Sequence, residues 1–382
     1  MLIKKIIPVN RPIITNQDAR EVYKTVKSGW VSSSGSKIIS FEKALCKISD
    51  RKYCSTVSNG TAALEIAIKS LGIKNGDEVI MPTFTIISNA NAIIKNYAKP
   101  ILVDSDLSTW NIDIKQIEQK ITKRTKAIML PHIYGFPNDM KKILKICKKY
   151  SLFLIEDAAE MIGQKYFKKP CGSFGDISIY SFYANKQITT GEGGALLTNS
   201  KNLFKKFLEL RNLNFGKINR YNHSDISWNY RFTNIQAALG LSQIKRLKSI
   251  VRRKKEIGKQ YNKYLGNLNG IILQPEKLPY ANNIYWVFGL LLKPGLNKKK
   301  NLIQKELLKN KIDTRSFFWP MHKQTAFKKI KLFKKKKYPI ADYLSSSGFY
   351  LPSGIGTTNK EIKYICIKLR EVILKFSSKK FK

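Results

Sequence analysis

Between about residues 50 and 200, short apolar runs alternate with amphipathic segments of helix length, and this alternation restricts the possible folds strongly. The amphipathic segments carry apolar residues at three- and four-residue spacing, which predicts helices with one buried face. Strands that alternate with helices indicate an α/β fold with a mostly parallel sheet covered on both faces. The expected strands are EVIM (78–81), PILVD (100–104), KAIML (126–130), LFLIED (152–157) and DISIYSF (176–182). The expected helices are TAALEIAIKSLG (61–72), SNANAIIKN (88–96), DIKQIEQKI (113–121) and NDMKKILKICKKY (138–150).

The sequence changes character after a long helical pattern at 232–266. We expect two domains, a large α/β domain with an N-terminal arm over residues 1–250 and a smaller α+β domain over residues 251–382. The features expected in the smaller domain are a strand IYWVFGLLL (284–292), helices at 298–310 and 359–376, and a basic surface loop FKKIKLFKKKK (327–337).

The chain is strongly basic, with 70 lysines and arginines against 26 acidic residues and a net charge of +44. Only 12 of the basic residues are arginine, whose planar fork nucleic-acid recognition favours. The abundance of lysine, isoleucine and asparagine along the whole chain therefore indicates a compositional bias, and we expect no nucleic-acid partner. The positive field would still attract an anionic substrate.

No run approaches the ~18 consecutive apolar residues of a membrane span, and the start MLIKKIIPVNRP lacks the features of a signal peptide. We therefore expect a cytoplasmic protein without a membrane segment. The five cysteines are widely spaced and form no CxxC pair, so we expect neither a disulfide framework nor a metal site.

One segment, residues 157–194, contains the groups that pyridoxal phosphate (PLP) requires. The coenzyme needs an amine for its Schiff base, a carboxylate beside its pyridine nitrogen and donors for its phosphate. Asp157 ends an apolar run, and ligands of parallel sheets bind at the carboxyl ends of strands. Lys186 follows a strand that bears Ser181 and precedes a glycine-rich turn. By itself each is ambiguous, since Asp157 could be a polar strand end and Lys186 one of 58 lysines.

A possible phosphate site precedes the helix at 61–72. In the segment Ser58-Asn59-Gly60-Thr61, Gly60 permits close backbone approach, and free helical N–H groups and the Thr61 hydroxyl follow. A plain helix N-cap is the alternative interpretation. Ser181 could supply a further hydroxyl.

Taken together, these segments resemble the sugar aminotransferases of the DegT/DnrJ/EryC1/StrS family over nearly the whole chain. The matching segments include SGWVSSSG, VSNGTAALEIAIKSLGIKNGDEVIMPTFT, ITKRTKAIMLPHIYG, IEDAAE, SFYANKQITTGEGGALLTN, NYRFTNIQAALGLSQ and WPMH. The resemblance implies an aspartate-aminotransferase-type fold, a homodimer with active sites at the interface, and transfer of an amino group from L-glutamate to a 4-keto-6-deoxy sugar nucleotide. VSNGTAAL, DSDLSTWNIDI and NKQITTGEGG are most similar to members that act on GDP-4-keto-6-deoxymannose.

The resemblance also assigns roles. Lys186 would be the Schiff-base lysine, Asp157 the partner of the pyridine nitrogen and Glu160 a neighbour of the ring hydroxyl. Gly60, Thr61 and Ser181 fall at phosphate positions, and Asn229 at that of an asparagine that reaches the neighbouring subunit's phosphate. The expected substrate contacts are His322, His132 and Tyr134, of which the last two could equally be core residues.

The chain departs from the family pattern at Ile86, where relatives carry an aromatic that stacks on the coenzyme, and at Ser227-Trp228 before Asn229. These departures leave the shape of the pocket open. A lysine at position 186 favours amino transfer over the dehydration that a histidine marks in this family. Action on a UDP- or dTDP-linked 4-keto or 3-keto sugar remains an alternative. A non-catalytic regulator with the same fold, or a basic nucleic-acid-binding protein, is an alternative of another class.

Overall fold

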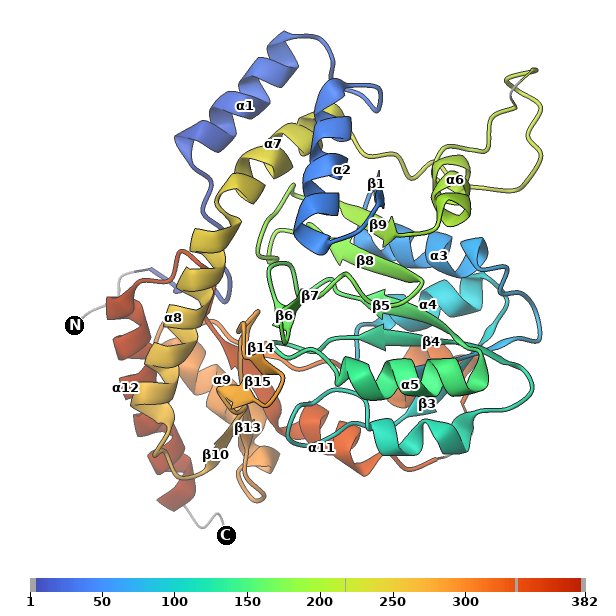
Figure 1. Cartoon of the computed structure of the whole chain (residues 1–382). Coiled ribbons are helices and arrows are strands. Elements are labelled where there is room, and N and C mark those ends of the chain that lie inside the picture. The colour runs from blue at the N-terminus through green and yellow to red at the C-terminus, as the bar shows by residue number, and fades with distance from the viewer. Residues whose placement is uncertain (1–4, 217, 334–335, 379–382) are drawn as a thin grey trace.

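The chain, seen in a computed structural model that describes residues 5–216, 218–333 and 336–378, has a seven-stranded sheet at its centre (Figure 1). The sheet is parallel except at β9, which runs antiparallel to both of its neighbours. In spatial order its strands are β1 (Tyr53–Val57), β9 (Gly194–Thr198), β8 (Ile177–Ser181), β5 (Phe153–Asp157), β4 (Thr125–Pro131), β2 (Glu78–Pro82) and β3 (Lys99–Val103).

Both faces of this sheet are covered because alternate strand residues point to opposite sides. In β2, Val79 and Met81 pack with one set of helices, and Ile80 packs on the other face. The first face carries α3 (Gly60–Ser70), α4 (Ile87–Lys95) and α6 (Lys201–Leu210). The second carries α2 (Ser36–Ser49), α5 (Met140–Tyr150) and α7 (Asn234–Lys245), and α1 (Asn16–Lys27) packs on α7. Each fully buried aliphatic side chain in these layers contributes roughly 1.5–3 kcal/mol.

A second, four-stranded sheet is antiparallel and is built from the C-terminal part of the chain. Its core packs β13 against the helices α8, α9 and α12. Its strands are β10 (Ile271–Leu273), β13 (Phe288–Leu292), β15 (Gly348–Leu351) and β14 (Arg315–Ser316), and its helices are α8 (Leu247–Leu265), α9 (Lys300–Lys309) and α12 (Asn359–Ser378). The domain boundary that we expect near residue 250 falls inside α8, and it stays a prediction.

The remaining elements are short. Ile7 forms a bridge with Ile312 and packs in the core of the C-terminal part of the chain. The hairpins are β6 (Lys165–Tyr166) with β7 (Lys169–Pro170) and β11 (Lys277–Leu278) with β12 (Ala281–Asn282). The short helices are η1 (Ile114–Gln116), η2 (Glu118–Lys120), η3 (Asn297–Lys299), η4 (Met321–Lys323), α10 (Thr325–Lys329) and α11 (Pro339–Ser347). None of the helices in the described ranges combines the length and apolar character that a membrane crossing needs.

Four sequence expectations are wrong in detail. The helix expected at 113–121 is the pair of 3₁₀ turns η1 and η2, which meet at Ile117. The helix expected at 232–266 is divided at Arg246, whose side chain pairs with Asp18 of α1 at 2.5 Å. The strand at 284–292 begins only at Phe288, since Tyr285 has a positive φ of 52°. The supposed loop at 327–337 begins inside α10 with a buried Phe327, and positions 334–335 lie outside the described residues.

Candidate active site

A cavity of about 450 Å³ lies at the carboxyl ends of β4, β5 and β8, next to the N-terminus of α3. This is the edge of a parallel sheet at which ligands bind. Parts of the chain that are far apart in the sequence contribute to its wall. The site residues expected from the sequence that line it are Gly60, Thr61, Ile86, His132, Asp157, Glu160, Ser181 and Lys186.

Lys186 lies on the connection that reverses the chain between β8 and the antiparallel β9. This connection is tied down by Gln187, whose amide donates to the Glu160 carbonyl oxygen at 2.6 Å. The Lys186 ammonium nitrogen lies 4.0 Å from the ring centre of Trp286, within the range of a cation–π contact. Removal from water lowers the pKa of Lys186, and the nearby Glu160 and Asp157 carboxylates partly oppose this shift. The lowered pKa increases the fraction of free amine, the nucleophilic form.

Asp157 is the last residue of β5 and is almost fully buried. One carboxylate oxygen accepts a hydrogen bond from the Asn89 side chain at 3.0 Å, and the other accepts from the Ala159 N–H at 3.1 Å. Burial raises the pKa of Asp157, whereas these two donors and the positive charge of Lys186 lower it. The carboxylate is therefore held in one orientation at the cavity wall.

Glu160 is buried and, like Asp157, lines the cavity. Its Oε2 accepts a hydrogen bond from the Tyr134 N–H at 2.7 Å, and Tyr134 has a positive φ of 61°. Burial raises the pKa of Glu160 above the usual carboxyl range, although the charge of Lys186 counteracts the shift. The Tyr134 ring itself packs among the aromatic core residues Phe317 and Trp286.

The N-terminus of α3 forms a polar cradle at the other end of the cavity. The Asn59 side chain caps the helix by accepting from the Ala62 N–H, which leaves the earlier helical N–H groups without an intrahelical partner. The Thr61 hydroxyl donates to the Ser88 hydroxyl at 2.8 Å, and Ser181 faces the same space. A Cβ at Gly60 would lie 3.1 Å from the Cβ of Ser181, so glycine allows the helix to approach β8 closely.

These groups match the chemistry of PLP. Lys186 offers the amine, Asp157 the carboxylate for a ring nitrogen, and the α3 cradle the donors for a phosphate. The buried Asn185 Oδ1, at the edge of the cavity, has no hydrogen-bond partner among the described residues and offers a further contact. Ile86, 44% exposed at the start of α4, presents an aliphatic surface to the same space.

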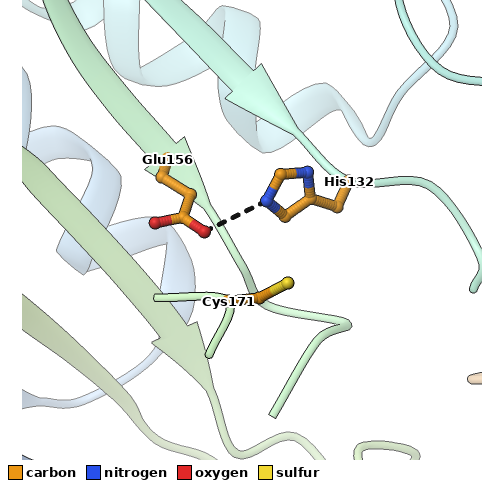
Figure 2. Close-up of side chains that lie close together, drawn as sticks. All are labelled: His132, Glu156 and Cys171. Atoms are coloured by element: carbon orange, nitrogen blue, oxygen red, sulfur yellow. Dashed lines mark hydrogen bonds and ion pairs between the residues drawn. The ribbon is translucent and has the colours of Figure 1, made fainter. Parts of the chain in front are cut away.

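His132, which lines the cavity, also belongs to a buried cluster with Glu156 and Cys171 (Figure 2). The spacing of their ligand atoms, within 4.8 Å of one another, would suit a metal ion. However, both Glu156 oxygens already accept hydrogen bonds, from the N–H groups of Gly172 and Phe174 among others. Burial also raises the pKa of the Cys171 thiol, which disfavours the thiolate that a metal needs. The cluster thus serves to anchor the loop before β8.

The other residues expected at the site lie elsewhere. Three expected site residues, Asn229, His322 and Tyr134, are not among the described residues that line the cavity. Asn229 is exposed, and its backbone forms a bridge with Asn212. The ring nitrogens of His322 lie 2.8 Å from the Thr83 hydroxyl and 2.9 Å from an Asp342 oxygen.

Several residues of the site escaped the sequence analysis. Asn89, which holds the Asp157 carboxylate from behind the cavity wall, is buried on the apolar face of α4, and a polar residue in such a place is a signal that could have revealed it. Trp286 and Arg315 come from the smaller domain, and no local pattern links them to Lys186.

The comparisons with known proteins agree with this geometry. Residues 12–370 match the DegT/DnrJ/EryC1/StrS aminotransferase family. The chain is 40% identical over 367 residues to GDP-perosamine synthase of Escherichia coli O157:H7, which covers 96% of this chain and 98% of that one. It is 36% identical to GDP-perosamine synthase of Vibrio cholerae, over 94% and 97% of the two chains. Spr1654 of Streptococcus pneumoniae, described as a sugar aminotransferase and solved in its PMP form, is 27% identical with a TM-score of 0.92 over 98% and 99% of the chains.

The fold and these relatives define a PLP-dependent aminotransferase with the aspartate-aminotransferase-type architecture. That class contains many branches with different substrates. The chain belongs to the DegT/DnrJ/EryC1/StrS family of sugar aminotransferases, as its sequence motifs indicated.

Proposed function

We propose that this enzyme transfers the amino group of L-glutamate to GDP-4-keto-6-deoxymannose and thereby forms GDP-perosamine, a precursor for surface polysaccharide such as O-antigen. The observation that carries the proposal is the 40% identity to a GDP-perosamine synthase over 96% of the chain. The similarity covers nearly the whole chain, and residues from its N-terminal and C-terminal parts, from Asn59 to Tyr350, line the cavity.

In this proposal, bound PLP supplies an electron sink for the electrons released when a proton leaves the substrate carbon. Lys186 would hold the coenzyme through its amine, and the same Nζ would accept that proton. Asp157, fixed by Asn89, would keep the pyridine nitrogen protonated. Glu160 would face the ring hydroxyl, and Gly60, Thr61 and Ser181 would bind the phosphate.

We further propose that the active unit is a homodimer. Asn229 is exposed and lies outside the cavity of its own chain, which suits a residue that completes the phosphate site of a second subunit. We assign substrate contacts to His132, His322 and Tyr134, of which His132 lines the cavity. The pKa of His322 is lowered by burial, so its ring would act as a neutral hydrogen-bonding group.

The test is mass spectrometry of the products formed from a panel of keto-sugar nucleotides with L-glutamate as donor. Formation of GDP-perosamine at the highest kcat/KM supports the proposal. Faster amination of a UDP- or dTDP-linked keto sugar, or of a 3-keto sugar, would replace the substrate and keep the enzyme class. A protein that takes up PLP but aminates no member of the panel would favour the non-catalytic alternative.

A further inference from the structure

A second cavity, of about 620 Å³, is larger than the catalytic cavity and shares no residue with it. It lies on the face of the large sheet that carries α5, between that helix, the turns η1 and η2, and the hairpin of β11 and β12 (Figure 1). We call it the α5 pocket. Among the described residues of its wall, none comes from the α1–α2 connection or from the segment around Asn229, so it is separate from the surface proposed for the second subunit. A cavity of this size can hold a small organic ligand.

One wall residue, Asn138, carries a buried hydrogen-bond acceptor that the fold leaves unused. Asn138 is 1% exposed, and its Oδ1 has no hydrogen-bond partner among the described residues. The orientation of the amide is fixed, because its Nδ2 donates to the Pro131 carbonyl oxygen at 2.9 Å and that oxygen can only accept. A buried polar group without a partner is destabilising. An N–H or O–H group of a ligand in the pocket would satisfy it.

Two exposed lysines of the wall, Lys115 and Lys145, lack a carboxylate partner. Within the described ranges, neither of them forms an ion pair. The neighbouring Lys149 differs, because its ammonium group pairs with Glu118 at 2.7 Å. Lysine ammonium groups bind phosphate as point charges. Lys115 and Lys145 are therefore suited to bind an anionic group of the ligand.

The described wall as a whole contains four lysines and four carboxylates, so its formal charge is balanced. Two of the carboxylates already serve the fold. Asp106 Oδ1 accepts from the hydroxyls of Ser108 and Thr109, and Asp113 accepts from the Gln116 side chain. A balanced wall does not favour a polyanion such as a nucleic acid, and it suits a ligand that combines one anionic group with hydrogen-bond donors.

The third feature of the wall is apolar surface. It comes from Ile112, Ile114, Ile146 and Leu278, and the half-buried ring of Tyr280 adds an aromatic face. A flat ring system could pack there. A nucleoside phosphate combines the three groups that match this wall, namely a flat base, N–H donors on that base and a phosphate.

Asn138 also connects the α5 pocket to the catalytic cavity. Its backbone N–H donates to Nδ1 of His132 at 3.1 Å, and its Nδ2 lies 2.9 Å from the same nitrogen. Since Nδ1 accepts, the neutral ring carries its proton on Nε2, which donates to Glu156 at 3.1 Å (Figure 2). A ligand that binds the Asn138 amide therefore acts on the ring of His132, which lines the catalytic cavity.

We propose that the α5 pocket binds a nucleoside phosphate and that the bound ligand alters the catalytic cavity through Asn138 and His132. Lys115 and Lys145 bind the phosphate, Asn138 Oδ1 accepts from an N–H group of the base, and the base packs on the apolar wall. None of these three residues lines the catalytic cavity, so the inference does not depend on which keto sugar is aminated.

Isothermal titration calorimetry of the PLP-loaded enzyme with GMP, guanosine and inorganic phosphate tests the site at constant ionic strength. We expect saturable GMP binding that weakens by about tenfold in Lys115→Gln and in Lys145→Gln. Guanosine and phosphate should bind more weakly than GMP, because each has only part of the matching groups. Lys148→Gln is the matched control, since Lys148 is exposed on the same helix, is not among the described wall residues and changes the net charge equally.

The proposal is overturned if GMP shows no saturable binding, if phosphate binds as tightly as GMP, or if Lys148→Gln weakens binding as much as the pocket variants do. Unchanged GMP affinity in both pocket variants also overturns it, because the nucleotide then binds elsewhere, as in the catalytic cavity. Both lysines are exposed, so their replacement should leave folding intact, and retained PLP absorbance verifies this.

The visible absorbance spectrum of the bound PLP tests the connection to the catalytic cavity. Saturating GMP should shift this spectrum in the wild type and leave it unchanged in Asn138→Ala, whose side chain no longer reaches His132. An unaltered wild-type spectrum, or an equal shift in Asn138→Ala, would refute the connection. The wild-type spectrum alone keeps this part falsifiable if Asn138→Ala does not fold.

Discussion

Two opposing effects of the surroundings set the pKa of the Lys186 amine, and that pKa bears on its reactivity. Burial favours the neutral amine, and the carboxylates of Asp157 and Glu160 favour the charged form. The lowered pKa shows that the loss of water has the larger effect. A lysine held in this way is suited to form a covalent bond and then to move a proton.

We predict that Lys186→Ala folds but loses transamination by several orders of magnitude, because nucleophile and proton carrier are removed together. Lys186→Arg keeps the charge without a usable amine and should be equally inactive. Single-turnover spectra with L-glutamate measure the loss. A Lys186→Ala enzyme that retained even a tenth of the rate would remove this residue from the chemistry.

We also predict that in the coenzyme-free protein Lys186 titrates below the usual value of about 10.4. The Glu160 carboxylate raises the pKa of Lys186, so Glu160→Gln should lower that pKa further. The rate at which acetic anhydride modifies Lys186, followed against pH by peptide mass spectrometry, gives both values. An unshifted pKa in the wild type, or a rise in Glu160→Gln, would contradict this electrostatic account.

A substitution at Ile86 shows how much the affinity for PLP depends on stacking against the coenzyme ring. An aromatic pair adds about 0.5–1.5 kcal/mol beyond buried area, so Ile86→Tyr should tighten PLP by roughly tenfold or less. The tyrosine is also expected to crowd the sugar and raise KM. Equilibrium dialysis and steady-state kinetics provide the readouts, with Ile39→Tyr, at an exposed position on α2, as control. Unchanged affinity and kinetics would mean that this side chain does not face the ring.

At the scale of elements, the site depends on how closely the N-terminus of α3 approaches the end of β8. A Cβ at Gly60 would meet the Ser181 Cβ at 3.1 Å, closer than side chains usually pack. We predict that Gly60→Ala weakens PLP binding by about tenfold, as the helix shifts away from the phosphate. In a Ser181→Gly background the added methyl has room, so Gly60→Ala should cost less there. Equal losses of PLP affinity in the two backgrounds would refute the steric explanation.

The sequence predicts elements well where burial alone decides them. The expected strands at 78–81, 126–130 and 152–157 are found as β2, β4 and β5, because continuous apolar runs have few alternatives in a sheet covered on both faces. The break between α7 and α8 could not be predicted, since the apolar periodicity continues through it. It occurs where Arg246 turns to meet Asp18, a contact between residues 228 positions apart.

The same limit applies to the candidate site. Lys186, Asp157 and Gly60 are marked by motifs beside strand ends, so local sequence locates them. Trp286 lies beside the Lys186 amine although 100 positions separate the two residues, so only the tertiary fold brings them together. Tyr134 lies two residues after His132 in the sequence, but its backbone has a positive φ, its ring packs in the core and its N–H donates to Glu160.

At the scale of the whole molecule, we propose that a second subunit completes the phosphate site of each chain. Asn229 is exposed and absent from the wall of its own cavity, although the segment that carries it is anchored by the bridge to Asn212. A fixed backbone with an exposed amide is suited to a contact with a second subunit. This arrangement predicts that each active site draws Lys186 from one subunit and Asn229 from the other.

We predict that Lys186→Ala and Asn229→Ala enzymes, each strongly impaired alone, recover activity when their subunits are exchanged. A heterodimer has one site with both residues intact, so an equal mixture should reach roughly one quarter of the wild-type number of sites. Native mass spectrometry verifies the exchange, and each variant taken through the same procedure alone is the control. If verified heterodimers show no recovery although Asn229→Ala is impaired alone, Asn229 acts within its own chain, because only then are both sites of the heterodimer defective.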